Sequence, residues 1–137
     1  IAGTENILGS LNGVFFTDTN TSKPTFANHL LASNAASDIV ALVNDSPLQQ
    51  YEVRSNNTGA SAQTDVGNTA DIAYTAGSTA NFVSRCTLND STLNNNAEQQ
   101  IKVIGVSRDP ENNDLTAANV VWRVLINQSF FNDLTGV

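Results

Sequence analysis

The stretch Val120-Val121-Trp122-Arg123-Val124-Leu125-Ile126 is rich in β-branched residues and carries the only tryptophan of the chain, which is typical of a core strand. The earlier stretch Ile101–Ser107 has apolar residues on both faces, as a central strand buried on two sides would. We expect Arg123 to leave the sheet at an edge or to pair with a carboxylate. The polar segment between the two stretches, residues 108–119, contains Pro110 and is predicted to be a surface loop.

Shorter strand-like runs fill much of the remaining chain, and clusters of Asn, Ser, Thr, Gly and Asp separate them, which is the all-β pattern. One of these runs, residues 50–54, alternates apolar and polar residues, so one of its faces is predicted to meet solvent. A hairpin is predicted around the glycine-containing loop Thr75–Ser78. The predicted strands are Gly13–Thr17, Asp38–Val43, Gln50–Arg54 and the two hairpin strands, Asp71–Tyr74 and Asn81–Cys86.

Helix is predicted to be scarce, with one or two turns within residues 27–37 and within residues 94–100. We therefore expect a single all-β domain, a small barrel or sandwich, over residues 13–131. Residues 1–12 are expected to form an extended N-terminal arm and residues 132–137 a C-terminal tail. The arm has too little apolar content to fold alone, but it could cover a neighbouring subunit.

The composition excludes several classes of protein. The chain has 137 residues, of which only 14% are charged, where a soluble domain has about 25%. Uncharged polar residues replace the missing charge, with 19 Asn, 14 Thr and 12 Ser. No apolar run approaches the roughly 18 residues of a membrane helix, so no membrane partner is expected. A net charge of −7 with only six Lys and Arg argues against nucleic acid as a partner.

Few residues suggest chemistry. The chain has one cysteine, Cys86, which cannot form an internal disulfide. It also has one histidine, His29, so any catalytic triad would have to contain this residue. Residues Asp109–Asp114 imitate the start of a calcium loop, but Asp114 and Val120 stand where such a loop needs Gly and Glu. A solvated turn is therefore the favoured interpretation of this segment. We expect no catalytic residue, no cofactor and no metal site.

Several segments, in order, resemble a family of small head proteins of tailed bacteriophages, especially marine phages. Residues 8–18, LGSLNGVFFTD, are similar to the family's opening LGxLxGVxYTD, and Phe26-Ala27-Asn28 matches its Ala-Asn dipeptide. Residues 43–53, with Asn44-Asp45-Ser46-Pro47 before Tyr51-Glu52-Val53, resemble its DDPxxxFxVQ strand.

The later segments extend this resemblance to about residue 131. Residues 65–71, DVGNTAD, match the family's DVGxxAD turn, and residues 104–112, IGVSRDPEN, resemble its ILGLxxDPEN stretch. The chain departs from the family at residues 127–130, where NQSF stands in place of NHQF and the histidine is absent.

The resemblance implies a virion structural protein that decorates or cements the capsid by binding the major capsid protein in many copies. We further expect a homo-oligomer on the capsid surface of a particle assembled in the host cytoplasm, with a trimer favoured because clustering around a symmetry axis adds avidity. The resemblance brings no catalytic residues, so the chain is not expected to be an enzyme.

Three alternatives stay open. The chain could be a minor head–neck or tail component of the same kind of virion. It could be a subunit of a cell-surface fibre, whose Thr- and Asn-rich composition would be similar. An enzyme, for example one that acts on carbohydrate, would need a concave site around His29 or around a pair of carboxylates.

Overall fold

The structure is a computed structural model that describes residues 5–31 and 33–131. These residues form nine strands in three antiparallel sheets, and their only helical elements are two three-residue 3-10 turns, η1 (Gln63–Asp65) and η2 (Asp90–Thr92). The predicted all-β class is confirmed, and the described sheets are open and sandwich-like, with none closed into a barrel. The strands are β1 (Ser10–Asp18), β2 (Lys23–Ala27), β3 (Val40–Asn44), β4 (Gln50–Arg54), β5 (Thr69–Ala70), β6 (Ile72–Ala73), β7 (Thr87–Leu88), β8 (Ile101–Val106) and β9 (Val121–Ile126).

The main sheet has the strand order β4-β9-β8-β5, so the tryptophan-bearing strand lies inside it. Trp122 pairs with Val53 of β4 and with Val106 of β8, and its side chain is fully buried. Alternation along β4 is confirmed, because Tyr51 and Val53 are half-buried while the residues between and beside them are exposed. The core that forms on this sheet contains Ala70, Leu88, Ile101, Val103, Val120, Trp122 and Val124.

The expected burial of the earlier strand on both faces and the expected edge position of Arg123 are wrong. Strand β8 is not buried on both faces, because Lys102 is exposed between the buried Ile101 and Val103. Arg123 does not leave at an edge: β9 is an inner strand, and the Arg123 Nε–H donates to the carbonyl of Val106 at 3.2 Å. Its guanidinium crosses Gly105, where a Cβ atom would lie 2.9 Å from an Arg123 Nη atom. The missing side chain at Gly105 therefore gives the arginine its path across the sheet.

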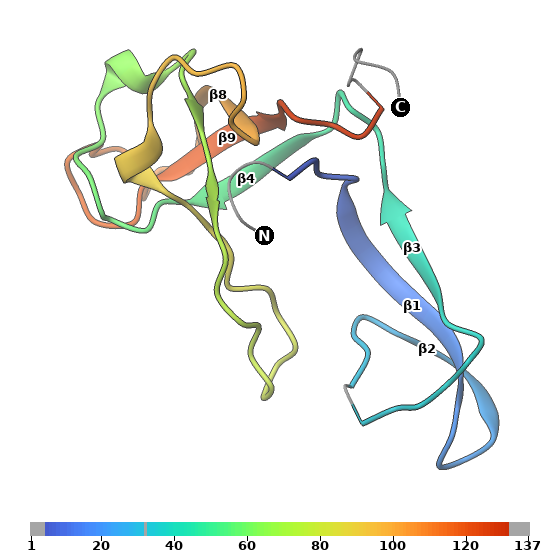
Figure 1. Cartoon of the computed structure of the whole chain (residues 1–137). Coiled ribbons are helices and arrows are strands. Elements are labelled where there is room, and N and C mark those ends of the chain that lie inside the picture. Colours follow the sequence, from blue (N-terminus) through green and yellow to red (C-terminus); the bar gives the residue numbers. More distant parts are fainter. Residues whose placement is uncertain (1–4, 32, 132–137) are drawn as a thin grey trace.

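A second sheet, with the order β2-β1-β3, extends away from the main sheet (Figure 1). Strand β1 pairs with β2 and β3 on its two sides, with a register shift between Leu11 and Gly13. Strand β2 was not predicted, because Pro24 and its polar neighbours hide the apolar alternation that marks a strand. Residues 45–49 connect this sheet to β4 of the main sheet.

The two predicted short helices are wrong. In residues 27–31 and 33–37, the described part of the first segment, the side-chain oxygen of Asn34 accepts from the backbone N–H of Ala36, which is a turn bond. In residues 94–100, Asn96 makes the same kind of bond to the N–H of Glu98, and Gln99 and Gln100 are buried. Side-chain bonds to the local backbone compete with helix formation, and here they prevail over helix propensity.

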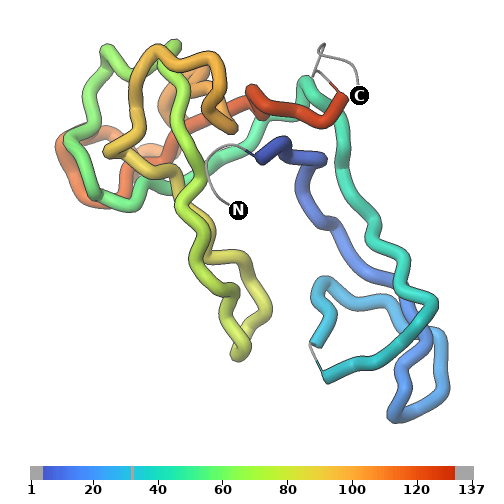
Figure 2. The backbone as a smooth tube through the Cα atoms, viewed as in Figure 1, coloured from blue at the N-terminus to red at the C-terminus, as the bar shows by residue number. Residues whose placement is uncertain are grey.

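The predicted hairpin exists, but its second strand lies later in the chain than expected. Ile72 and Ala73 of β6 pair with Leu88 and Thr87 of β7, whereas residues 81–86 belong to the long loop that joins the two strands. This loop projects from the main sheet beside the second sheet (Figure 2). The ring of Phe82 at its tip stacks on His29, with centroids 3.6 Å apart, so the two projecting parts touch.

The part of the expected N-terminal arm that the structure describes, residues 5–12, contacts the domain closely. The N–H of Ile7 donates to the carbonyl of Gln128 at 2.8 Å, and the N–H of Phe130 donates back to Ile7 at 3.2 Å. Ser10–Asn12 belong to β1. The expected tail, residues 132–137, lies outside the described residues.

The segment before β3 is fastened to β1 by a carboxylate. The Thr17 hydroxyl donates to Asp38 Oδ2 at 2.6 Å, and the Thr17 N–H donates to the two carboxylate oxygens at 3.0 and 3.2 Å. These bonds hold the pKa of Asp38 below its usual range. A carboxyl with a lowered pKa in the folded state stabilises the fold above its unfolded pKa, and this contribution is lost as the pH falls through the folded value.

We predict that Thr17→Val raises the pKa of Asp38 without fully restoring its ordinary value, because the backbone N–H bonds remain. Asp114 is a matched control, because the hydroxyl and N–H of Thr116 lower the pKa of its carboxyl in the same way elsewhere in the chain. The measurement is a carboxyl-carbon NMR titration of both aspartates. An unchanged Asp38, or a shift of both aspartates together, would contradict the assignment of this effect to Thr17.

Candidate interaction surface

The single histidine is engaged in packing. His29 is half-buried, its ring lies within 3° of parallel to the ring of Phe82, and its Nδ1 is 2.7 Å from Asn28 Oδ1. A catalytic histidine needs a nucleophile or a substrate proton within hydrogen-bond reach. His29 contacts an amide and an aromatic ring, and it also lines the large cleft described below, whose other lining residues include Ser78, Thr79 and Ser84.

The loop that imitates a calcium site is a pair of capped turns. Asp109 Oδ1 accepts from the N–H of Glu111 at 3.0 Å, and Asp114 Oδ1 accepts from the N–H and hydroxyl of Thr116 at 2.9 and 2.6 Å. Asn112 ties the loop to the start of β9 through bonds to the backbone of Val121. Within residues 5–31 and 33–131, no group of three or more His, Cys, Asp or Glu side chains is placed to hold a metal ion.

A polar cluster that the sequence analysis did not identify joins β4 to η2. The buried carboxylate of Asp90 accepts from the hydroxyl of the equally buried Ser55 and, at 3.1 Å, from the N–H of Asn57. The side-chain oxygen of Asn56 accepts from the N–H of Asp90 at 3.2 Å. These bonds run between segments more than thirty residues apart in the sequence, so the cluster is structural.

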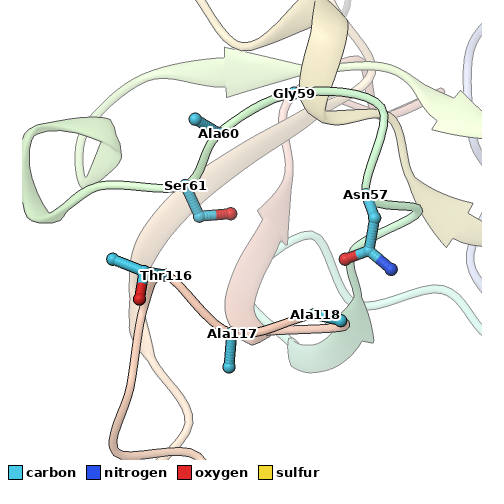
Figure 3. Close-up of a pocket in the computed structure, with 7 residues that line it drawn as sticks. All are labelled: Asn57, Gly59, Ala60, Ser61, Thr116, Ala117 and Ala118. Atoms are coloured by element: carbon cyan, nitrogen blue, oxygen red, sulfur yellow. The ribbon is translucent and has the colours of Figure 1, made fainter.

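A depression of about 320 Å³ lies beside this cluster (Figure 3). Its walls come from two loops, residues 57–61 and 116–118, and carry no titratable side chain. None of the lining side chains is therefore a candidate general acid or base. The lining residues are Asn57, Gly59, Ala60, Ser61, Thr116, Ala117 and Ala118.

The half-buried thiol of Cys86 belongs to a different, mainly apolar cleft of about 370 Å³. This cleft lies between the N-terminal segment at Ile7, the hairpin at Ile72 and the main sheet at Val124. Arg85, beside the cysteine in sequence, is exposed to solvent. The cysteine therefore sits at the margin of the core.

The most unusual feature of the molecule is its exposed apolar surface. Fourteen large hydrophobic residues of the described chain are exposed, and nine of them lie between residues 8 and 42, in β1, β2, β3 and the segments that adjoin them. Single exposed hydrophobic residues are ordinary, whereas contiguous apolar patches mark interaction sites. The nine are Leu8, Leu11, Phe15, Phe26, Leu30, Leu31, Ile39, Val40 and Leu42.

Seven of these residues form two differently shaped surfaces. One is a concave cleft of about 830 Å³ between the second sheet and the projecting hairpin loop, lined on one side by Leu11, Leu30 and Leu31 and on the other by Tyr74 and Val83. The other is a face of the β2-β1-β3 sheet. The sequence predicts that the hydrophobic residues of β1 and β3 belong to strands. It does not predict that they are exposed, because periodicity does not show whether another layer covers a sheet face.

No protein-family model, curated protein or solved structure matches this chain. Among the described residues, no helix has the length and apolar content that crossing a membrane requires.

Proposed function

We propose that this chain is a virion structural protein that decorates and cements a capsid by binding the major capsid protein in many copies. The observation that carries the proposal is the concentration of exposed hydrophobic residues on one projecting part of an otherwise polar, acidic β domain. A protein that acts by covering other subunits needs such a surface and needs no catalytic group. In this proposal the chain works at the capsid surface as a homo-oligomer, with a trimer favoured, and binds neither nucleic acid nor membrane.

The concave cleft is the part of this surface that we assign to the capsid. A cleft of about 830 Å³ with apolar walls fits a protruding segment of another protein. Serines and a threonine also line it, through Ser10, Ser78, Thr79 and Ser84, and they offer hydrogen bonds for a peptide backbone. Binding to assembled shells but not to free subunits stabilises the shell by mass action, and several linked copies add avidity.

The test is cosedimentation of the purified protein with empty capsids that lack it, scored for stoichiometry and for capsid melting temperature. We expect saturable binding at a ratio compatible with capsid symmetry and a raised melting temperature. Leu31→Glu, which places a charge in the cleft, should weaken capsid binding by about tenfold or more. Leu48→Glu is the control, because Leu48 is 79% exposed and lies outside the cleft.

Absence of binding by the unmodified protein would contradict the proposal. Filaments formed at high protein concentration, without capsid binding, would favour a fibre subunit instead. Equal loss of binding in the Leu31 and Leu48 variants would remove the cleft from the proposal.

A further inference from the structure

One face of the β2-β1-β3 sheet carries four large apolar side chains that solvent reaches. Phe15 of β1 lies directly opposite Phe26 of β2 and Val40 of β3, and Leu42 of β3 lies opposite Gly13. Side chains opposite one another, or two residues apart on a strand, lie on the same face. Their exposed fractions are 45% for Phe15, 61% for Phe26, 54% for Val40 and 47% for Leu42. We call this set the apolar face.

Gly13 makes the apolar face continuous. A Cβ atom at this position would lie 2.4 Å from Cζ of Phe26, so the Phe26 ring lies over the glycine. The ring thereby reaches from β2 across β1 toward Leu42, which is opposite Gly13 on the far strand. The three strands present one joined hydrophobic surface instead of separate side chains.

The other face of the same sheet is already covered. Val14 and Phe16 alternate with Phe15 along β1, and their exposed fractions are only 4% and 5%. An apolar sheet face is stable when a second layer packs on it. Val14 and Phe16 are covered within the chain, whereas the four side chains of the apolar face are exposed.

The charge distribution indicates what kind of layer fits. Strands β1, β2 and β3 contain only two charged residues, Asp18 and Lys23, which lie opposite each other at one end of the sheet and, by strand alternation, on the face away from Phe15 and Phe26. A partner recognised by charge would therefore dock elsewhere on this chain, whose net charge is −7. Another copy of this face meets one carboxylate at the edge, that of Asp38 on Thr17, and no charged side chain among the four apolar ones, whereas most other surfaces of an acidic protein would repel a copy.

The size of the apolar face also suits self-association. Its four side chains expose about 350–400 Å² of apolar surface, at the scale of the largest patches on monomers. Interfaces are about 60% apolar, so such a patch corresponds to about 600 Å² per copy and about 1,200 Å² in total. That total reaches the lower end of the range for specific interfaces.

We propose that the apolar face packs against the same face of another copy of this chain. Two copies would form a sandwich with sheets about 10 Å apart, in a self-complementary two-fold contact. In a trimer, the apolar faces of three copies would instead meet around the three-fold axis. The inference rests on this surface alone. If the chain self-associates through the apolar face but does not bind capsids, the inference stands and the proposed function fails.

The test compares two phenylalanines of nearly equal exposure. Phe26 is 61% exposed within the apolar face, and Phe130 is 62% exposed outside it. Sedimentation equilibrium over a wide concentration range should show that the unmodified chain self-associates. Phe26→Glu should weaken the association by about a hundredfold, because it places an unpaired charge in a closed interface. Phe130→Glu, with the same change of charge, should associate like the unmodified chain. Far-UV circular dichroism confirms that both variants fold.

A second measurement uses the unmodified sequence and does not depend on the folding of a variant. In a mixture of isotope-labelled and unlabelled chains, filtered NOEs should connect the methyl groups of Val40 and Leu42 in one copy to phenylalanine rings in another. A monomer at all concentrations, equal weakening by both variants, or NOEs at a different surface would each overturn the inference. If the chain is monomeric and its apolar face becomes protected from solvent on capsids, the partner of this face is the capsid protein.

Discussion

Replacing Trp122 by alanine is expected to lower the free energy of unfolding by about 3–5 kcal/mol, a large share of what a domain of this size has. Trp122 is fully buried on the inner strand β9 and lies between Val53 of β4 and Val106 of β8. Its removal leaves a cavity in the core that forms on one face of the main sheet. The measurement is urea unfolding followed by far-UV circular dichroism, because the variant lacks the tryptophan that fluorescence would report.

Trp122→Phe separates the volume of the side chain from its polar group. The indole Nε1–H is buried and has no acceptor among the described residues, so phenylalanine removes an unsatisfied donor as well as part of the volume. We expect this variant to lose much less stability than the alanine variant. Leu48→Ala is the surface control and should change stability by less than about 0.5 kcal/mol. An alanine variant within about 1 kcal/mol of the unmodified protein would show that β9 does not organise the core.

The strands that could be predicted from sequence are those whose own residues form a buried or alternating face. Residues 50–54 were predicted with the observed bounds, and β9 was predicted to within one residue at its start. Strand β2 could not be predicted, since its pairing with β1 determines its conformation and its sequence shows only Phe26 as a large apolar residue. The same limit explains the two wrong helices, where Asn34 and Asn96 bond to the local backbone.

The candidate surfaces depend on information that no local pattern contains. Phe15 and Phe16 are adjacent and chemically identical, yet one is 45% exposed and the other 5%. The alternation of a strand predicts that they face opposite ways, but which face is covered depends on where other segments pack. The cleft likewise requires residues 28–31 and the hairpin loop at Phe82 to meet, and they are some fifty residues apart in sequence.

Gln100 connects three segments of the chain from within the core, and its replacement is the second change expected to have a large effect. Its side chain is fully buried: the amide oxygen accepts from the N–H of Ile72 at 2.9 Å, and the amide nitrogen donates to the carbonyl of Glu5 at 3.2 Å. Its own carbonyl accepts from the N–H groups of Asn127 and Gln128. The residue therefore holds the N-terminal segment, the start of the hairpin and the end of β9.

Gln100→Leu keeps most of the volume but removes the side-chain bonds to Ile72 and Glu5, and we expect it to cost about 1–3 kcal/mol of unfolding free energy. Gln100→Glu should cost more at neutral pH, because it buries a charge and turns a carboxylate oxygen toward the Glu5 carbonyl. Burial raises the pKa of the introduced carboxyl above its ordinary value. Its destabilising effect should therefore shrink as the pH is lowered through that raised value, because the neutral form can again donate.

The local readout is hydrogen exchange, which separates this role from a general loss of stability. The amides of Ile7 and Ile72 should exchange faster in Gln100→Leu than the amides inside β9, because the side chain of Gln100 holds the segments that carry them and not the strand itself. Gln63→Leu, at an exposed glutamine of η1, is the control and should leave all of these rates unchanged. Uniform acceleration of every amide would mean that Gln100 only fills space. Selective release would show that a core glutamine determines how firmly the N-terminal segment, and with it the start of the exposed apolar sheet, is attached to the domain.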